Sequence, residues 1–232
     1  MTDPRADIFA AVRAAKPEVF NEAPERIAIL DGVLDDFGVA REVVAPKAHA
    51  LTDPAIFFAK VREITGPLDQ TQVDVIDRLL ASAPHWPIGW LAYGLATAWH
   101  EARLKPIEEI GKGKGRPYGK PGKHGQSQHG RGLVQLTWDR NYEHADQKLG
   151  LGGKLVADFN LALDPYIASA ILVRGMEEGW FTGKRLRDCI VERGTHDAFV
   201  KARRIINGTD RAQQIAGHAE RFQDALAAGG WA

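Results

Sequence analysis

Carboxylates flank a polar, irregular stretch of the chain and could supply a general acid and a general base. His100 and Glu101 end the apolar run IGWLAYGLATAWHE at residues 88–101, where partial removal from water would favour the protonated group that a general acid needs. Glu108 and Glu109 follow at the entrance to a glycine-rich segment. Two carboxylates on facing walls of a cleft are the minimum for glycoside hydrolysis. An exposed pair of glutamates at a helix end would have the same spacing, so both interpretations stay open at this point.

The sequence lacks the motifs of several other catalytic and binding sites. HEARL at 100–104 lacks the second histidine of a zinc-binding His-Glu-x-x-His helix, and Ser127 lacks a Gly-x-Ser-x-Gly elbow. The Gly-Lys-Gly-Lys-Gly run is not followed by the Gly-Lys-Ser/Thr of a phosphate loop. His124, His129 and His144 match no standard metal spacing. We therefore expect neither a metal nor a cofactor.

Helices must hold these groups, because most of the chain carries helical periodicity. Pro4, Pro24 and Asp53-Pro54 each open an amphipathic run, and residues 88–101 are apolar all round, which is typical of a core helix. Residues 111–132 hold eight glycines and two prolines, which exclude a helix and favour tight turns and short strands. Further helices are expected from a Thr137 cap over 138–149, from Asp164-Pro165 to Gly179, over 197–206, and from a Thr209 cap to Ala228. The expected fold class is mainly α, with a small β-hairpin in the glycine-rich stretch.

The chain divides into an N-terminal helical extension at 1–50 and a main domain at 51–232. The segment IFAAVR near the N-terminus recurs as FFAKVR, and each copy follows Thr-Asp-Pro, so the extension could repeat residues 52–83. Chance similarity is the equal alternative. The segment GVAREVVAPKAHAL at 38–51 is the expected linker. The extension could pack on the main domain as a helical pair or bind the cell wall, and the sequence leaves this open.

The charge of the chain is zero overall and uneven along its length. Residues 1–100 carry 9 basic and 14 acidic groups (net −5), whereas residues 101–154 carry 11 and 6 (net +5). A neutral total argues against a nucleic-acid partner. The single Cys189 excludes an intrachain disulfide, and its setting favours a packed thiol over a nucleophile. The N-terminus has no secretory signal and no segment approaches the about 18 apolar residues of a membrane span, so we expect synthesis in the cytoplasm without membrane insertion.

A motif in the second half resembles a known family. GRGLVQLTWDRNY at 130–142 matches Gly-Arg-Gly-x-x-Gln-Leu-Thr/Ser-x-x-x-Asn-Tyr at every specified position. Together with WHE at 99–101 and RRIINGTD at 203–210, it resembles glycoside hydrolase family 19, the chitinase-like group that includes bacterial and phage cell-wall lysozymes. The similarity spans about residues 85–228. It implies a lysozyme-like fold of two helical lobes around a cleft and an inverting mechanism.

The resemblance also implies roles for individual residues. Glu101 corresponds to the general acid, and Glu109 is the better candidate for the base, with Glu108 as the fallback. An inverting site needs its carboxyl groups roughly 6.5–9.5 Å apart, so that a water fits beside the sugar. Gln135 and Thr137 match positions that hold the water and the sugar. The remaining candidates for substrate contacts or for support of the site are His100, Glu108, Tyr118, Arg131, Asn141 and Asn207.

Departures from the family pattern move the expected substrate from chitin towards peptidoglycan. Ala102 replaces a threonine, Gln128-His129 replaces two tyrosines, and the basic glycine-rich loop replaces a cysteine-bearing one. We expect a monomeric phage-type endolysin that acts on peptidoglycan in the periplasm after release through a separate holin-type pore. The alternatives are a chitinase, a lytic transglycosylase, and a non-catalytic wall-binding module.

Overall fold

The computed structural model describes residues 4–16, 30, 33–34 and 48–231, and divides the chain into compact units at 1–47 and 48–232. The first unit contains helix α1 (Pro4–Ala15), which begins at the proline expected to open it. The second helix expected from Pro24 lies largely outside the described residues, as does most of the proposed repeat. All ten candidate site residues belong to the second unit.

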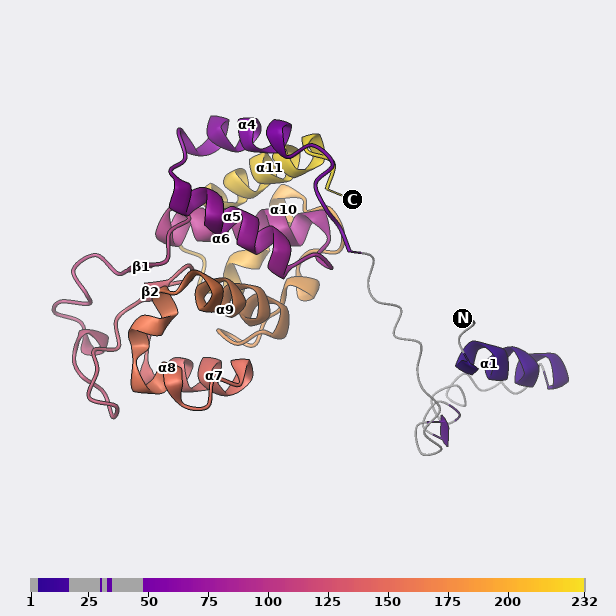
Figure 1. Ribbon diagram of the computed structural model, residues 1–232, viewed down its shortest axis with the longest axis horizontal. Coiled ribbons are helices and arrows are strands. Elements are labelled where there is room, and N and C mark those ends of the chain that lie inside the picture. The colour runs from indigo at the N-terminus through magenta and orange to yellow at the C-terminus, as the bar shows by residue number, and fades with distance from the viewer. Residues whose placement is uncertain (1–3, 17–29, 31–32, 35–47, 232) are drawn as a thin grey trace. The chain divides into compact units, whose positions relative to one another are not determined.

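The second unit is built almost entirely of helices, as the sequence predicts (Figure 1). Its α-helices are α4 (Pro54–Thr65), α5 (Gln70–Ser82), α6 (Ile88–Ala102), α7 (Asp139–Leu149), α8 (Lys154–Ala157), α9 (Pro165–Glu178), α10 (His196–Ala202) and α11 (Ala212–Ala228). Short 3-10 helices are η1 (Pro117–Gly119), η2 (Phe159–Leu163), η3 (Leu186–Asp188) and η4 (Arg203–Ile205). The two strands are β1 (Ile107–Glu108) and β2 (Arg131–Gly132).

Several helices begin where local capping dictates. The Asp53 side chain accepts a hydrogen bond from the backbone N–H of Ile56, and Pro54 occupies the first turn of α4. A reciprocal capping box between Asp69 and Gln72 starts α5. Asp164 caps α9 in the same way as Asp53 caps α4, and Gly179 ends α9 in the left-handed conformation. The starts of α4 and α9 and the end of α9 confirm the sequence predictions, whereas the cap of α5 was not predicted.

The core centres on α6, which is apolar on nearly every side. Ten of its fifteen residues are buried, and α11 packs against both α6 and α4. Helix α10 packs against α11, and α5 packs against both α6 and α9. In Figure 1, these helices lie above α9, and α7 and α8 lie below it. Burial of α6 fixes the place where its polar C-terminal end, with Glu101, reaches the surface.

The small hairpin forms where the glycine-rich segment predicts it. Strands β1 and β2 are antiparallel, with Glu108 opposite Arg131 and Ile107 opposite Gly132. The intervening loop extends away from the helices (Figure 1). Each strand is only two residues long, and further contacts hold the loop: the Ser127 hydroxyl donates to the Gly119 carbonyl, and the Lys123 N–H donates to the Asp139 side chain.

Two of the expected threonine caps are wrong. Helix α7 begins at Asp139, after Trp138 with a φ of 77°, and the Thr137 hydroxyl instead donates to the carbonyl of Gln135. The Asp139 N–H is satisfied by the side-chain oxygen of Gln128, so a distant residue replaces the local cap. Helix α11 begins at Ala212, and its flanking residue is Arg211 in the left-handed conformation rather than Thr209.

Three smaller observations bear on the sequence predictions. Cys189 is half-buried against the core, and burial raises the pKa of its thiol, as a packed thiol requires. Among the described residues, none of the helices has the length and apolar character to traverse a bilayer. The segment expected to be helical over 197–206 divides into α10 and η4.

The stability of the hairpin should depend on glycine at position 132, because there is no room for a Cβ atom there. Both Gly132 and Gly125 have a φ above 70°, but a Cβ atom on Gly132 would lie 2.6 Å from the carbonyl oxygen of Ala162, whereas Gly125 faces open space. Gly125→Ala should lower the free energy of unfolding by about 1 kcal/mol through backbone strain alone. Gly132→Ala should cost about 1–3 kcal/mol more through overpacking. Urea unfolding of both variants measures this, and equal losses would show that the Cβ clash is absent.

Candidate functional site

An open cavity of about 930 Å³ brings most of the candidate residues together. Its walls come from the end of α6, from β1, from the glycine-rich loop, from the start of α7 and from the segment after η4. Eight of the ten candidates line it, namely Glu101, Glu108, Glu109, Tyr118, Gln135, Thr137, Asn141 and Asn207. His100 and Arg131 do not.

Glu101 is held by a buried guanidinium group. Its Oε1 accepts a hydrogen bond of 2.6 Å from Nη1 of Arg203, whose side chain is only 4% exposed while that of Glu101 is 18% exposed. The Nε of Arg203 donates to the carbonyl of Asp210, which orients the guanidinium plane. Glu101 therefore presents one fixed carboxyl group to the cavity.

Glu109 is held by uncharged donors. The Tyr118 hydroxyl donates to Oε1 at 3.1 Å, and the backbone N–H of Gly130 donates to Oε2 at 3.2 Å. The backbone N–H of Glu109 donates in turn to the Gly130 carbonyl. These bonds orient the carboxylate without pairing it with a formal charge, so it can accept a proton from a water in the cavity.

Glu108 has a different environment, although it is the next residue. Its carboxylate pairs with Lys112 at 2.7 Å and lies 3.0 Å from Nε2 of His129. The hydrogen bond from Lys112, followed by the one from His129, lowers the pKa of Glu108. Burial lowers the pKa of His129 itself. Glu108 is therefore bound into a network of charges, which makes it a weaker base than a carboxylate with neutral partners.

The Gly-Arg-Gly motif supplies a row of polar side chains on the cavity wall. The Gln135 amide donates to the carbonyls of Ile107 and Gly132, and its own backbone has a φ of 54°. Asn141 donates from Nδ2 to the Thr137 carbonyl. These side chains join β1, β2 and the start of α7. Both residues also line the cavity.

Arg131 supports the wall from behind. Its side chain is 5% exposed and donates to Asn160 Oδ1, to the hydroxyl of Tyr142, and to the carbonyls of Ser127 and His129. Its Nε lies 3.9 Å from Glu108. Arg131 thus contacts the site through other residues rather than through the cavity, so of the two expected roles it has the supporting one.

The remaining two candidates lie at the edges of the site. His100 is half-buried beside Glu101, and burial lowers the pKa of its imidazole, so a neutral ring is favoured near neutral pH. Asn207 is exposed on the opposite side of the cavity, and its side-chain oxygen accepts from the N–H of Gly208.

Aromatic and aliphatic side chains form the rest of the cavity. Tyr118 and Trp138 meet edge to face, with ring centroids 5.6 Å apart, and Trp138 is 38% exposed. Ile110 is almost fully exposed at the cavity rim. Apolar surface next to hydrogen-bonding groups is the combination that binds sugar rings, which have apolar C–H faces and polar edges.

Sequence reasoning missed several of the lining residues. Arg203 lies in the quoted segment RRIINGTD, but a buried arginine cannot be distinguished there from an exposed one. Its partner Glu101 is 102 residues away, so no local pattern reveals the pair. Arg203 holds Glu101 without lining the cavity; the lining residues that the sequence did not reveal include Ile107, Ile110, Val134, Arg140, Phe181, Thr182, Arg204, Ile206 and Gly208. Across the described part of the chain, no three His, Cys, Asp or Glu side chains come together as a metal ion would need.

The fold of the chain is similar to that of solved chitinase structures. Chitinase C from Streptomyces griseus HUT6037 matches with a TM-score of 0.54 and 23% identity, over 73% of this chain and 75% of that one. A mutant of chitinase C matches with a TM-score of 0.54 and 22% identity, over 75% and 92%. A bacterial family 19 chitinase matches at a TM-score of 0.46 and 18% identity, over 75% and 94%.

The first two matches show that this chain has a chitinase-like fold, which confirms the mainly α class with a small hairpin. No protein-family model and no curated protein matches the sequence.

The charge network around Glu108 can be tested by titration. Lys112→Met should raise the pKa of Glu108, because the largest interaction that lowers it is the hydrogen bond from Lys112. A lowered carboxyl pKa stabilises the fold above the unfolded value of about 4.3, and the contribution is lost as the pH falls through the folded pKa. NMR titration of the side-chain carboxyl carbons measures the shift. Lys114→Met is the control on the same loop, and an unchanged Glu108 pKa in Lys112→Met would refute the network.

Proposed function

We propose that this protein is a glycoside hydrolase that cleaves β-1,4 bonds in the glycan strands of peptidoglycan by an inverting mechanism. One observation carries the proposal. Glu101 and Glu109 come from separate elements, α6 and the loop after β1, and both line the same open cavity. A pair of carboxyl groups that merely shared a helix end would not meet across a space large enough for a sugar.

The roles of the two groups are those that the family resemblance implies, and the partners of each group hold it in position. Glu101 protonates the glycosidic oxygen while the bond from that oxygen to the anomeric carbon breaks. Glu109 removes a proton from a water whose oxygen bonds to the anomeric carbon from the opposite face, so the product has inverted configuration. Arg203 fixes the orientation of Glu101, and Tyr118 and the Gly130 N–H fix that of Glu109.

Glu109 is preferred to Glu108 as the base. The carboxylate of Glu108 is engaged by Lys112 and His129, and its lowered pKa reduces its affinity for a proton. Among the other cavity residues, Gln135 and Thr137 orient the water. Asn141 and Asn207 offer amide groups to the sugar.

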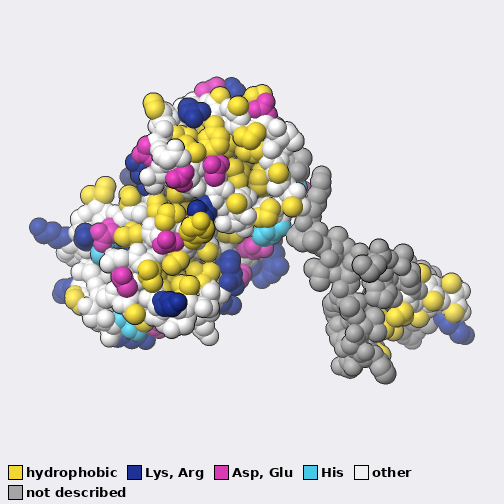
Figure 2. All heavy atoms as spheres, viewed as in Figure 1, with side chains coloured by type: hydrophobic (Ala, Val, Ile, Leu, Met, Phe, Trp, Pro, Cys, Tyr) yellow, Lys and Arg dark blue, Asp and Glu magenta, His cyan; other side chains and the backbone are white. Residues whose placement is uncertain are grey.

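The positive charge of the glycine-rich loop at 111–132 favours a negatively charged polymer as the substrate. Lysine and arginine side chains protrude along the edge of the molecule that the glycine-rich loop forms (Figure 2). Peptidoglycan carries carboxylates on its peptides, whereas chitin is neutral. Chitinase activity is the second candidate, favoured by the names of the structural neighbours.

The proposal extends to the place of action. Residues 51–232 form the catalytic domain, and the protein acts as a monomer. The protein reaches the wall through a separate holin-type pore, as a phage-type endolysin does.

Removal of the general acid should abolish wall lysis. Glu101→Gln should slow turbidity loss of permeabilised Gram-negative cells by a factor of roughly 10²–10⁴, because the leaving oxygen is no longer protonated. Glu109→Gln should cause a loss of similar size, and Glu108→Gln, the matched control beside it, a much smaller one. Retained lysis in Glu101→Gln would overturn the acid assignment.

Products from purified sacculi distinguish the remaining alternatives. Mass spectrometry of the fragments should show a hydrolysed reducing end. An anhydro sugar would indicate a transglycosylase, and binding without fragments a non-catalytic module. Release from glycol chitin alone would indicate a chitinase.

Lysis should weaken as salt rises, because the basic loop attracts the wall over a distance. Raising the ionic strength from about 0.01 M to about 0.15 M shortens the screening length from about 30 Å to about 8 Å. Turbidity assays should therefore slow several-fold, and the double variant Lys114→Gln/Lys120→Gln should lose most of this dependence. The control is Lys60→Gln/Lys201→Gln, which removes two lysines from helices α4 and α10. Salt-independent lysis by the unaltered protein would contradict a role of the loop.

A further inference from the structure

A second hollow adjoins the cavity and shares a wall with it. Its volume is about 510 Å³, and it is lined by Lys123, Gln128, Trp138, Asp139 and Arg140. Trp138 and Arg140 line both spaces. A polymer in the cavity could therefore place a side branch over Trp138 and into the hollow without leaving the protein surface.

The hollow contains a buried carboxylate with unused hydrogen-bonding capacity. Asp139 is 8% exposed, and its Oδ2 accepts a hydrogen bond of 2.6 Å from the backbone N–H of Lys123. Its Oδ1 has no hydrogen-bond partner among the described residues. An unsatisfied buried acceptor costs about 1–3 kcal/mol, which an N–H donor entering the hollow would recover. The backbone of Gly122 packs closely on this carboxyl group, with no room for a Cβ atom between them.

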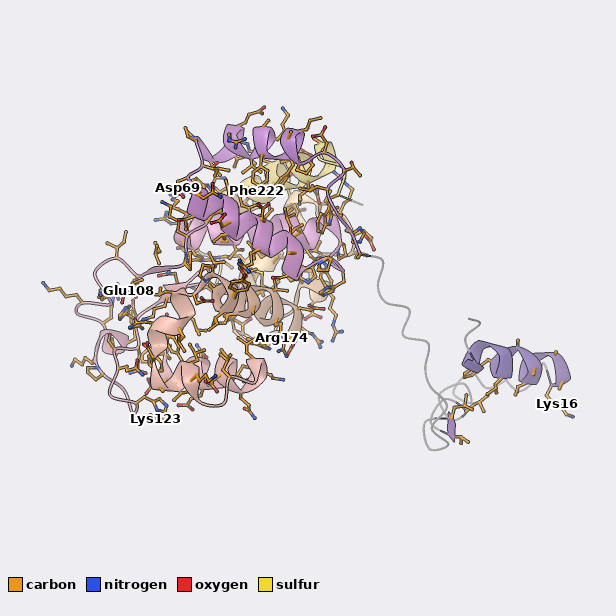
Figure 3. The ribbon with its side chains drawn as sticks, in the orientation of Figure 1. Lys16, Asp69, Glu108, Lys123, Arg174 and Phe222 are labelled. Atoms are coloured by element: carbon orange, nitrogen blue, oxygen red, sulfur yellow. The ribbon has the colours of Figure 1, made fainter. Side chains whose placement is uncertain are left out.

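Donors and positive charge surround the carboxylate. The Gln128 side-chain oxygen accepts from the Asp139 N–H, and Gln128 also lines the hollow. The Lys123 ammonium pairs with Glu143 at 2.8 Å, so its charge is partly compensated. Figure 3 shows Lys123 on the loop near α7, and Glu108 where the loop leaves the helices. Arg140 is exposed, and no ion pair is found for it within the described residues.

The hollow thus combines an acceptor for N–H groups, a free guanidinium for a carboxylate, and an aromatic wall. A bare sugar ring offers hydroxyl groups and an apolar face but no carboxylate for Arg140. A short acidic peptide offers all three, since its amides donate, its carboxylates pair with Arg140, and its small apolar side chains pack on Trp138.

We propose that this hollow binds the acidic peptide stem of a peptidoglycan strand whose glycan lies in the adjoining cavity. The inference rests on the proposed function, since it names the part of the substrate that separates peptidoglycan from chitin. The stem branches from the sugar chain, so it can cross the shared wall of Trp138 and Arg140 from the cavity into the hollow. The peptide binds beside the reacting sugars and takes no part in bond cleavage.

Hydrolysis of two matched substrates by the full chain tests the proposal. The first is soluble glycan strands that carry tetrapeptide stems, and the second is the same strands after an amidase has removed the stems. Arg140→Ala should lower kcat/KM for stem-bearing strands by about tenfold, which is the loss of one hydrogen bond to a charged group. Because Arg140 also lines the cavity, it should lower kcat/KM for stripped strands as well, but by a clearly smaller factor. Arg140→Lys should retain part of the preference, because an ammonium keeps the charge without the bidentate geometry.

A second variant and a control guard against indirect effects. Lys123→Gln should lower the preference for stems less than Arg140→Ala does, since Glu143 already compensates this charge. Lys60→Ala removes an exposed charge from α4 and should leave both rates unchanged. Circular dichroism melts of the variants check the fold.

The outcomes separate this inference from the proposed function. Equal rates on the two substrates, or an equal loss on both in Arg140→Ala, would overturn the stem site while leaving the hydrolase intact. Cleavage of neither substrate would overturn the proposed function itself. A preference for stem-bearing strands that Arg140→Ala abolishes is the result that supports the stem site.

Discussion

The wall of the cavity that carries Glu109 depends on one buried guanidinium group. Arg131 is almost completely removed from water, so each of its N–H groups needs an acceptor. It finds them in Asn160, in the Tyr142 hydroxyl, and in two carbonyls of the glycine-rich loop. These partners belong to η2, α7 and the loop. Because the loop has almost no sheet of its own, this network, together with the stacked rings of Tyr142 and Phe159 beneath it, defines its course.

The opposite wall follows from a different constraint, which is the burial of α6. A helix that is apolar on nearly all sides must lie inside, so only its C-terminal end can offer a polar group to the surface. There Arg203 meets Glu101, brought together by the packing of α10 and α11 around α6. The two carboxyl groups of the proposed mechanism therefore have contrasting partners. A guanidinium holds Glu101, whereas neutral donors hold Glu109.

Between the walls, the backbone takes conformations that side chains rarely adopt. Gln135 and Trp138 have φ values of 54° and 77°, which for a bulky residue such as tryptophan is costly. The turn places the Trp138 ring between the cavity and the hollow beside it. It also removes Thr137 from the capping position, and the amide oxygen of Gln128 takes over the bond to the first turn of α7. Local strain and a distant cap are thus two consequences of the same placement of Trp138.

The sequence by itself determined the helices, the irregular loop and the identity of the acidic residues. Proline, aspartate caps and apolar periodicity act over three or four residues, so α4, α5, α6 and α9 could be predicted directly. Only the tertiary structure decided which partner each carboxylate has, why Arg131 lies behind the wall, and that Arg203 reaches Glu101. Residues 102 positions apart meet because helices pack, and packing depends on the whole core rather than on any short segment.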